Sequence, residues 1–214
     1  MMQDEDDHSW LKQGSTSAAD VEKSYDEWAD TYEDTLEDWD YRAPQEAARL
    51  LQATVDDGAT ILDAGCGTGL TGVALKAAGF SGPIDGTDIS QASLDEAAAH
   101  GVYRELRQAD MQKLPLDIAT NAYDGLICIG VLTYIPDSEG VLREFARMVR
   151  RGGTVVVSQR DDLFQERAFG DTVKALTEAG FYAEATITEP QPYLPGNPDF
   201  GDEIKVIYAV MKVA

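Results

Sequence analysis

The chain has 214 residues, of which 43% are hydrophobic, and its formal net charge is −22 at pH 7. This composition suffices for one well-buried core, and no run of about eighteen apolar residues predicts a membrane-spanning helix. The negative charge repels phosphate backbones, so we expect no nucleic-acid partner. The acidic start "MMQDEDDHSW" is unlike a targeting segment, and the two cysteines lack metal-ligand spacing, which together favour a cytoplasmic location with reduced thiols.

Helices are predicted before the first strand. Residues 1–17 are rich in acids and small polar residues, which predicts a disordered acidic tail. Aromatic residues recur at three- or four-residue steps between Ala18 and Asp40, a spacing typical of amphipathic helices. A further helix is expected from residue 43 to 55, with Pro44 at its start, where the missing N–H costs nothing. We expect residues 18–56 to form one domain with residues 57–214.

After these helices, short apolar runs alternate with helical patterns. Strands are expected at residues 59–65, 82–89, 102–110, 122–132 and 154–159. Helices are expected at residues 70–80, 90–101, 137–153 and 166–181. Two last strands flank the proline-rich loop "EPQPYLPGNPDFG", residues 189–201. This alternation predicts an α/β fold with a doubly wound, mostly parallel sheet covered on both faces.

The stretch "ILDAGCGTGLTG", residues 61–72, ends an apolar run with an acid and then loses most of its side chains. Asp63 is followed by Gly65, Gly67 and Gly69, which allow a tight turn and a close backbone approach to a ligand. Such a turn follows the first strand of a doubly wound sheet, where ligands bind outside the carboxyl ends of the strands. The set Gly67, Gly69 and Gly72 also fits the dinucleotide fingerprint, and a plain tight turn is the structural alternative.

Acids at three successive strand ends favour another ligand over a dinucleotide. Asp63 adds a charge that a pyrophosphate does not favour, whereas it suits a cationic group. Asp88 ends the next strand, where a carboxylate can accept both ribose hydroxyls, although it could instead serve the N-terminus of the following helix. Asp110 ends the third strand within reach of an adenine amino group, or is a solvent-facing turn residue. An adenosine with an amino-acid tail fits this set, and that ligand is S-adenosylmethionine.

The sequence resembles the class I S-adenosylmethionine-dependent methyltransferases over residues 20–214. "ILDAGCGTG" looks like their first motif, "DGTDIS" like their second-strand acid, and "ADMQKLPL" like their adenine-contacting segment. "YDGLICIGVLTYIPD" and "MVRRGGTVVVS" resemble their fourth strand and the turn into their fifth. "YDEWADTYEDTLEDWDYRAP" is similar to the opening of methyltransferase-like proteins of the Williams–Beuren-region type. The resemblance implies a seven-stranded sheet with the last strand antiparallel, and N-terminal helices that cover the cofactor as a lid.

We expect the cofactor to contact the glycine loop, the strand ends and one lid tyrosine. The expected cofactor contacts are Tyr32, Asp63, Ala64, Gly65, Cys66, Gly67, Gly69, Asp88, Ile89, Asp110, Met111, Ile129 and Gly130. The candidates that face the acceptor are Tyr25, Tyr134, Arg160 and Tyr193, together with Phe200. The plainer alternatives are core packing for the aromatic and apolar residues and a surface ion pair for Arg160. Many relatives carry a histidine just after the fourth strand, where this chain has Thr133 and Tyr134.

The expected activity is in-line methyl transfer to a small-molecule acceptor, in a monomer or homodimer without a metal ion. With only two histidines in the chain, a histidine triad or a zinc site has almost no material. No motif identifies a general base. Two alternatives stay open: a non-catalytic protein that binds S-adenosylmethionine or S-adenosylhomocysteine, and an NAD-dependent oxidoreductase that uses the second glycine frame.

Overall fold

The computed structural model describes residue 11, residues 17–199, residue 201 and residues 203–214. Nearly all of the tail predicted at residues 1–17 lies outside this part of the chain. Two helices come first, α2 (Ala18–Asp38) and α3 (Ala43–Gln52). The Ser17 side chain accepts from the backbone N–H of Asp20 at 3.4 Å and so caps α2, and Pro44 lies in the first turn of α3. Both predicted helical segments are therefore confirmed.

Strands and helices then alternate as expected. The strands are β1 (Ile61–Ala64), β2 (Ile84–Asp88), β3 (Glu105–Gln108), β4 (Tyr123–Cys128), β5 (Val149–Arg160), β6 (Tyr182–Ile187), β7 (Gln191–Pro192) and β8 (Lys205–Val213). The helices are α4 (Leu70–Ala77), α5 (Gln91–Ala99), the 3₁₀ helix η1 (Leu132–Tyr134), α6 (Ser138–Met148), α7 (Asp161–Glu166) and α8 (Phe169–Glu178). Ser90 caps α5, since its Oγ accepts from the N–H of Ser93 at 3.0 Å.

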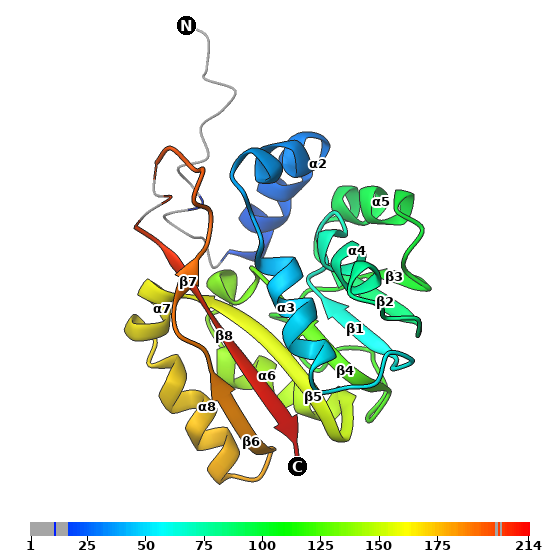
Figure 1. The fold of residues 1–214 in the computed structure, drawn as a ribbon, viewed down its shortest axis with the longest axis vertical. Coiled ribbons are helices and arrows are strands. Elements are labelled where there is room, and N and C mark those ends of the chain that lie inside the picture. Colours follow the sequence, from blue (N-terminus) through cyan, green and yellow to red (C-terminus); the bar gives the residue numbers. More distant parts are fainter. Residues whose placement is uncertain (1–10, 12–16, 200, 202) are drawn as a thin grey trace, which may run out of the picture.

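The strands form one sheet with the order β3-β2-β1-β4-β5-β8-β6 (Figure 1). The strands β1 to β5 pair in parallel, and β8, the last strand of the chain, lies antiparallel between β5 and β6. The sheet therefore has the predicted doubly wound architecture. The strand order reverses at β1 and β4, and the crevice outside their carboxyl ends is where this architecture binds ligands.

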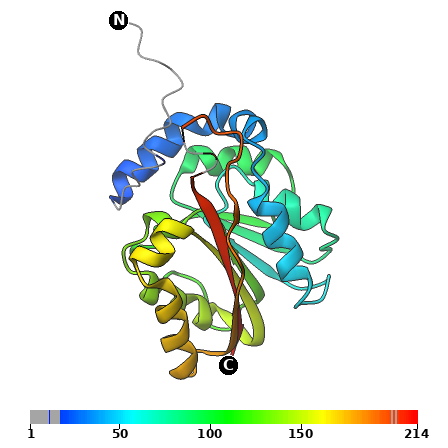
Figure 2. The ribbon, with the colours of Figure 1, turned by 60° about the vertical axis from the view of Figure 1, so that its left-hand side comes forward.

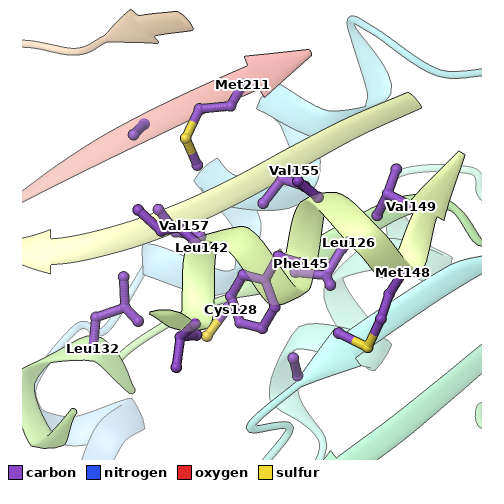
Figure 3. Packing of buried hydrophobic residues seen from close by; sticks show 14 of the residues in the cluster. Leu126, Cys128, Leu132, Leu142, Phe145, Met148, Val149, Val155, Val157 and Met211 are labelled. Atoms are coloured by element: carbon purple, nitrogen blue, oxygen red, sulfur yellow. The ribbon is translucent and has the colours of Figure 1, made fainter. Parts of the chain in front are cut away.

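Both faces of the sheet are buried, because successive residues of each central strand point to opposite sides. Leu62, Leu126 and Val155 belong to the core beneath α6 and α8, whereas Ile61 and Ile127 belong to the core beneath α3 and α4. Figure 3 shows the first core, where Phe145 of α6 packs among side chains of β4 and β5. These near-continuous apolar strands predict the parallel sheet, and the packing on both faces holds its carboxyl edge in place.

The structure corrects three of the predicted boundaries. The helix expected at residues 137–153 ends at Met148, because Val149 already pairs with Tyr123 as the start of β5. Gly152, with a φ of +74°, turns the chain inside this strand rather than closing the helix. The helix expected at residues 166–181 is divided between α7 and α8, where Ala168 has a φ of +47°. The proline-rich loop contributes β7, which adds a short eighth strand beside β8.

Candidate functional site

A cavity lies between α2 and the carboxyl ends of the parallel strands. Figures 1 and 2 show α2 crossing this end of the molecule. The cavity has about 720 Å³ of empty space, part of it open to solvent, which is a size typical of small-molecule sites. It is lined by Ala18, Val21, Tyr25, Tyr32, Tyr41, Gly65, Gly67, Asp88, Ile89, Ala109, Asp110, Met111, Gln112, Ile129, Gly130, Val131, Tyr134, Ile135 and Tyr193.

The glycine loop between β1 and α4 forms one wall. Gly65 has a φ of +79° and Gly67 a φ of +54°, a region of backbone conformation that favours glycine. A Cβ on Gly65 would collide with the side chain of Val131, whereas a Cβ on Gly67 would have no protein atom within 4 Å. Since Gly67 also lines the cavity, its bare backbone leaves room for a ligand to approach closely.

Asp88 presents its carboxylate where β2 ends at the cavity. Its Oδ2 accepts from the N–H of Gly67 at 2.8 Å, and its Oδ1 accepts from the N–H of Ser90 at 2.9 Å. Burial raises the pKa of this carboxyl group, while both backbone donors stabilise its charged form. Asp88 therefore ties the glycine loop to the start of α5, and the remaining lone pairs of its oxygens can accept from hydroxyl groups of a ligand.

Asp110 lies at the neighbouring strand end with both oxygens engaged. Its Oδ1 accepts from the N–H of Gln112 at 2.9 Å, and its Oδ2 pairs with Lys113 Nζ at 3.2 Å. Ile89 and Met111 line the same part of the cavity. One acid and two apolar side chains therefore lie together at the ends of β2 and β3, as the sequence predicted, and this combination suits a flat heterocycle with an amino group.

Asp63 lies beneath the glycine loop and does not line the cavity. Its side chain is fully buried; Oδ2 accepts from the hydroxyl of Tyr103 at 2.7 Å, and Oδ1 has no hydrogen-bond partner among the described residues. Burial raises the pKa of Asp63 to about 7, although the hydrogen bond from Tyr103 lowers it and the nearby charge of Asp88 raises it further. Any effect of this carboxylate on a bound cation acts through the loop above it.

The raised pKa predicts that Asp63→Asn changes how stability depends on pH. The folded protein holds the Asp63 proton up to about pH 7, whereas the unfolded chain releases it near pH 4, so the free energy of unfolding falls as pH rises between these values. A shift of about three pKa units corresponds to about 4 kcal/mol. Asp63→Asn should remove this part of the decline in urea unfolding series at pH 5, 6, 7 and 8. Parallel profiles for Asp63→Asn and the exposed control Asp56→Asn would contradict the assignment.

Five tyrosines form the other end of the cavity. Tyr25 stacks edge-on against Tyr134 with ring centres 5.9 Å apart, and its hydroxyl donates to the Tyr134 hydroxyl at 3.1 Å. Tyr41 and Tyr193 make a second edge-on pair at 5.6 Å, and Tyr32 also lines the space. Burial raises the pKa of each of these phenols, so all five stay uncharged at neutral pH.

Polar contacts tie α2 to the far side of the cavity. The Ser90 hydroxyl donates to Asp26 Oδ1 at 2.5 Å, and His100 Nε2 lies 2.9 Å from Glu33 Oε1. The backbone N–H of Gly196 in the proline-rich loop donates to the carbonyl of Trp39 at 3.1 Å, just after α2 ends. Both the α5 side and the loop before β8 therefore hold α2 over the cavity, which is the arrangement expected of a lid.

Nine of the thirteen predicted cofactor contacts line this cavity. Cys66 lines a smaller adjoining hollow of about 290 Å³ together with the glycine loop, whereas Ala64 is fully buried in β1. Gly69 begins α4 with a φ of +107°. Both cysteines are buried and free, as the sequence indicated.

Three of the predicted acceptor-facing residues, Tyr25, Tyr134 and Tyr193, line the cavity, and Arg160 does not. The Arg160 guanidinium donates to both oxygens of Asp162 and to the carbonyl of Leu11 at 2.6 Å, in keeping with the ion-pair alternative. Phe200 falls outside the described residues. In the part of the chain that the structure describes, no group of three or more His, Cys, Asp or Glu residues could hold a metal ion, and no helix is long and apolar enough to cross a membrane.

The sequence did not point to Tyr41, Gln112 or Tyr103. Tyr41 and Gln112 reach the cavity from segments between regular elements, where no periodicity marks a side chain. Tyr103 lies in the turn between α5 and β3, and its hydroxyl reaches Asp63 across forty residues of sequence. Val131 was recognised only as a possible apolar wall, and it also packs against the glycine loop. Such contacts depend on tertiary geometry rather than on local pattern.

Comparison with known proteins identifies this geometry. Residues 62–157 match a family described as a methyltransferase domain. The human methyltransferase-like protein 27 is 30% identical over 164 residues, which are 74% of this chain and 66% of that protein. The ubiquinone biosynthesis O-methyltransferase of Bordetella avium is 35% identical over 118 residues, 53% of this chain and 46% of that enzyme. The chain thus spans about two thirds of the first relative and about half of the second.

Solved structures show the same fold. A methyltransferase in a Haloferax volcanii complex with the Trm112 activator aligns with a TM-score of 0.67 at 18% identity, covering 90% of this chain and 97% of that chain. A Thermotoga maritima protein, described as a possible histamine N-methyltransferase, aligns with a TM-score of 0.64 at 14% identity, covering 89% and 98%. By its fold and its matched domain, the chain belongs to the class I S-adenosylmethionine-dependent methyltransferases.

Proposed function

We propose that the protein transfers a methyl group from S-adenosylmethionine to a small-molecule acceptor that carries no negative charge at the reacting end. The observation that supports this proposal is a single cavity with two different ends. One end combines the Gly67 backbone with the Asp88 carboxylate, and the other is built from five uncharged tyrosines.

The cofactor end fits the parts of S-adenosylmethionine by their chemistry. The Asp88 carboxylate can accept ribose hydroxyls, Ile89 and Met111 can flank the adenine, and Asp110 can accept from its amino group. The open space at Gly67 suits the amino-acid tail. The phenol hydroxyls can donate to the carboxylate of that tail, since no described residue that lines the cavity is Lys, Arg or His. Bound there, the cofactor would supply a methyl group on a positively charged sulfur.

The tyrosine end selects against anionic acceptors. Burying a carboxylate or phosphate without a counter-ion costs several kcal/mol, and the described lining offers neutral phenols, the Gln112 amide and apolar groups instead. A phenol, an amine or a thiol can hydrogen-bond to these hydroxyls and rest against the aromatic rings. The relatives named as ubiquinone biosynthesis O-methyltransferases, and the neighbour described as a possible histamine N-methyltransferase, support acceptors of this uncharged or cationic kind.

Catalysis in this cavity relies on alignment rather than on a strong base. The raised pKa of Tyr25, Tyr134 and Tyr193 keeps these phenols protonated, so none of them can take a proton at neutral pH. Asp88 and Asp110 lie at the opposite, cofactor-facing end. Holding the acceptor in line with the methyl group can lower the barrier by about 7–11 kcal/mol at best. The tyrosines and the lid helix α2 perform this positioning and exclude water.

A methyl-transfer assay tests the proposal. The protein would be incubated with methyl-labelled S-adenosylmethionine and matched sets of phenols, amines and thiols, each paired with a carboxylated or phosphorylated analogue. We expect label transfer to an uncharged or cationic acceptor and much less to its anionic analogue, with Asp88→Ala as the background. Tight cofactor binding without transfer to any acceptor would favour the non-catalytic alternative. Faster transfer to the anionic analogues would contradict the proposed selectivity.

The cellular setting is part of the proposal. We expect a cytoplasmic protein, monomeric or homodimeric, in which residues 18–56 and 57–214 act as one unit with α2 as the lid. The contacts of α2 with Ser90 and His100 support the single unit. Light scattering of the purified protein should give the mass of one or two chains, and a larger assembly would contradict this expectation.

A further inference from the structure

Tyr103 fills a space that two glycines leave open beneath the cofactor loop. It lies just before β3, and its ring reaches between β2 and the first turn of α4. A Cβ on Gly72 would collide with this ring, and a Cβ on Gly86 would lie 3.1 Å from its Cδ1 atom. Neither glycine has a positive φ. Their lack of side chains is therefore explained by the room that Tyr103 occupies, not by backbone conformation.

The Tyr103 hydroxyl joins the start of α4 to Asp63. It accepts from the backbone N–H of Gly72 at 3.1 Å and donates to Asp63 Oδ2 at 2.7 Å. Gly72 lies in the first turn of α4, where N–H groups lack partners within the helix, and Gly69 offers no side chain to cap them. One hydroxyl thus satisfies a helix donor and a buried carboxylate on opposite sides of the glycine loop.

This hydrogen bond also affects whether Asp63 is charged. The titratable groups that act on Asp63 are the Tyr103 hydroxyl, which lowers its pKa, and the Asp88 carboxylate, which raises it; Asp63 in turn acts on the buried thiols of Cys66 and Cys128. Burial raises the pKa of Tyr103 far above its ordinary value, so Tyr103 remains a donor at any physiological pH. Removing its hydroxyl would shift the titration of Asp63 upward, from about 7.

We propose that Tyr103 is a positioning residue for cofactor binding, which fixes the glycine loop through Gly72 and keeps Asp63 in its charged form beneath the cationic amino end of the cofactor. The second part rests on the proposed function, since it assumes a ligand with a cationic amine in this cavity. Tyr103 does not line the cavity, so its effect is transmitted by Asp63 and by the start of α4.

Tyr103→Phe tests this role because it keeps the ring and removes only the hydroxyl. The matched control is Tyr182→Phe, which removes another buried hydroxyl, donated to the carbonyl of Leu142 at 2.6 Å in the core on the opposite face of the sheet. Titration with S-adenosylhomocysteine from pH 6 to 8.5 should show affinity rising with pH in the wild type. For Tyr103→Phe we expect about tenfold weaker binding at pH 7 and a rise displaced to higher pH, and for Tyr182→Phe the wild-type profile.

Thermal unfolding without ligand gives a second readout. The pH range over which stability declines should extend upward in Tyr103→Phe and disappear in Asp63→Asn. An equal loss of affinity for Tyr103→Phe at every pH, or unfolding profiles parallel to those of Tyr182→Phe, would overturn the role assigned to Tyr103 while leaving the proposed function intact. If the wild type binds no S-adenosylhomocysteine at any pH, the proposed function fails, and the unfolding profiles still decide the link between Tyr103 and Asp63.

Discussion

Asp88→Ala is expected to weaken S-adenosylhomocysteine binding by about 100-fold or more. The carboxylate is the acceptor that we assign to the ribose hydroxyls, and each hydrogen bond to a charged group contributes about 1.5–3 kcal/mol, so losing two such bonds reaches this range. The substitution also leaves the N–H groups of Gly67 and Ser90 without their acceptor, which loosens the wall of the cavity. Isothermal titration calorimetry at neutral pH measures the effect.

Two further variants separate the ribose contact from general damage. Asp88→Asn keeps one carbonyl acceptor and should lose less affinity than Asp88→Ala. Asp56→Ala removes the same charge from an exposed loop before β1 and should bind as the wild type does. If Asp88→Ala binds as tightly as Asp56→Ala while remaining folded by circular dichroism, Asp88 serves only the start of α5, and the ribose assignment is wrong.

Gly67→Ala is expected to abolish tight cofactor binding at a modest cost in stability. The residue has a φ of +54°, and forcing alanine into this region costs about 1–2 kcal/mol. No protein atom lies within 4 Å of the added Cβ, so the fold can accept it. Because Gly67 lines the cavity, the methyl group would take the space of the ligand, and we expect affinity to fall at least about tenfold, that is by about 1.4 kcal/mol.

Gly101→Ala is the matched control for this substitution. Gly101 has a φ of +64° and likewise no atom within 4 Å of a Cβ, but it lies after α5, away from the cavity lining. Both variants should lose similar stability in thermal unfolding, and only Gly67→Ala should lose affinity for S-adenosylhomocysteine. Equal affinity in the two variants would show that no ligand approaches the loop backbone at Gly67.

The sheet and the glycine loop could be predicted from the sequence because their signals are local. Apolar runs such as "TVVVSQ" and the acid before Gly65 mark strand ends directly along the chain. The parallel order then brings Asp63, Asp88 and Asp110 to one edge of the sheet, as expected. The fold class was therefore within reach of pattern and resemblance together.

The finer geometry could not be predicted, because it depends on contacts between distant segments. Asp63 was expected to face the ligand, yet the side chain turns beneath the loop toward Tyr103, a residue with no motif of its own. The helix expected to end at glycines stops at Met148, since pairing with β4 overrides the local signal of the glycines. Tyr193 was expected near the acceptor, but its partner Tyr41 has no periodic marker in the sequence.

The central claim is that the cavity beneath α2 holds S-adenosylmethionine. Calorimetric titration of the wild-type protein with S-adenosylmethionine, S-adenosylhomocysteine and NAD tests it most directly. The expected result is tight binding of both sulfur ligands with one site per chain, and no detectable heat from NAD. Binding of NAD alone would mean that the glycines serve a dinucleotide through the frame of Gly67, Gly69 and Gly72, and it would contradict the proposed cofactor.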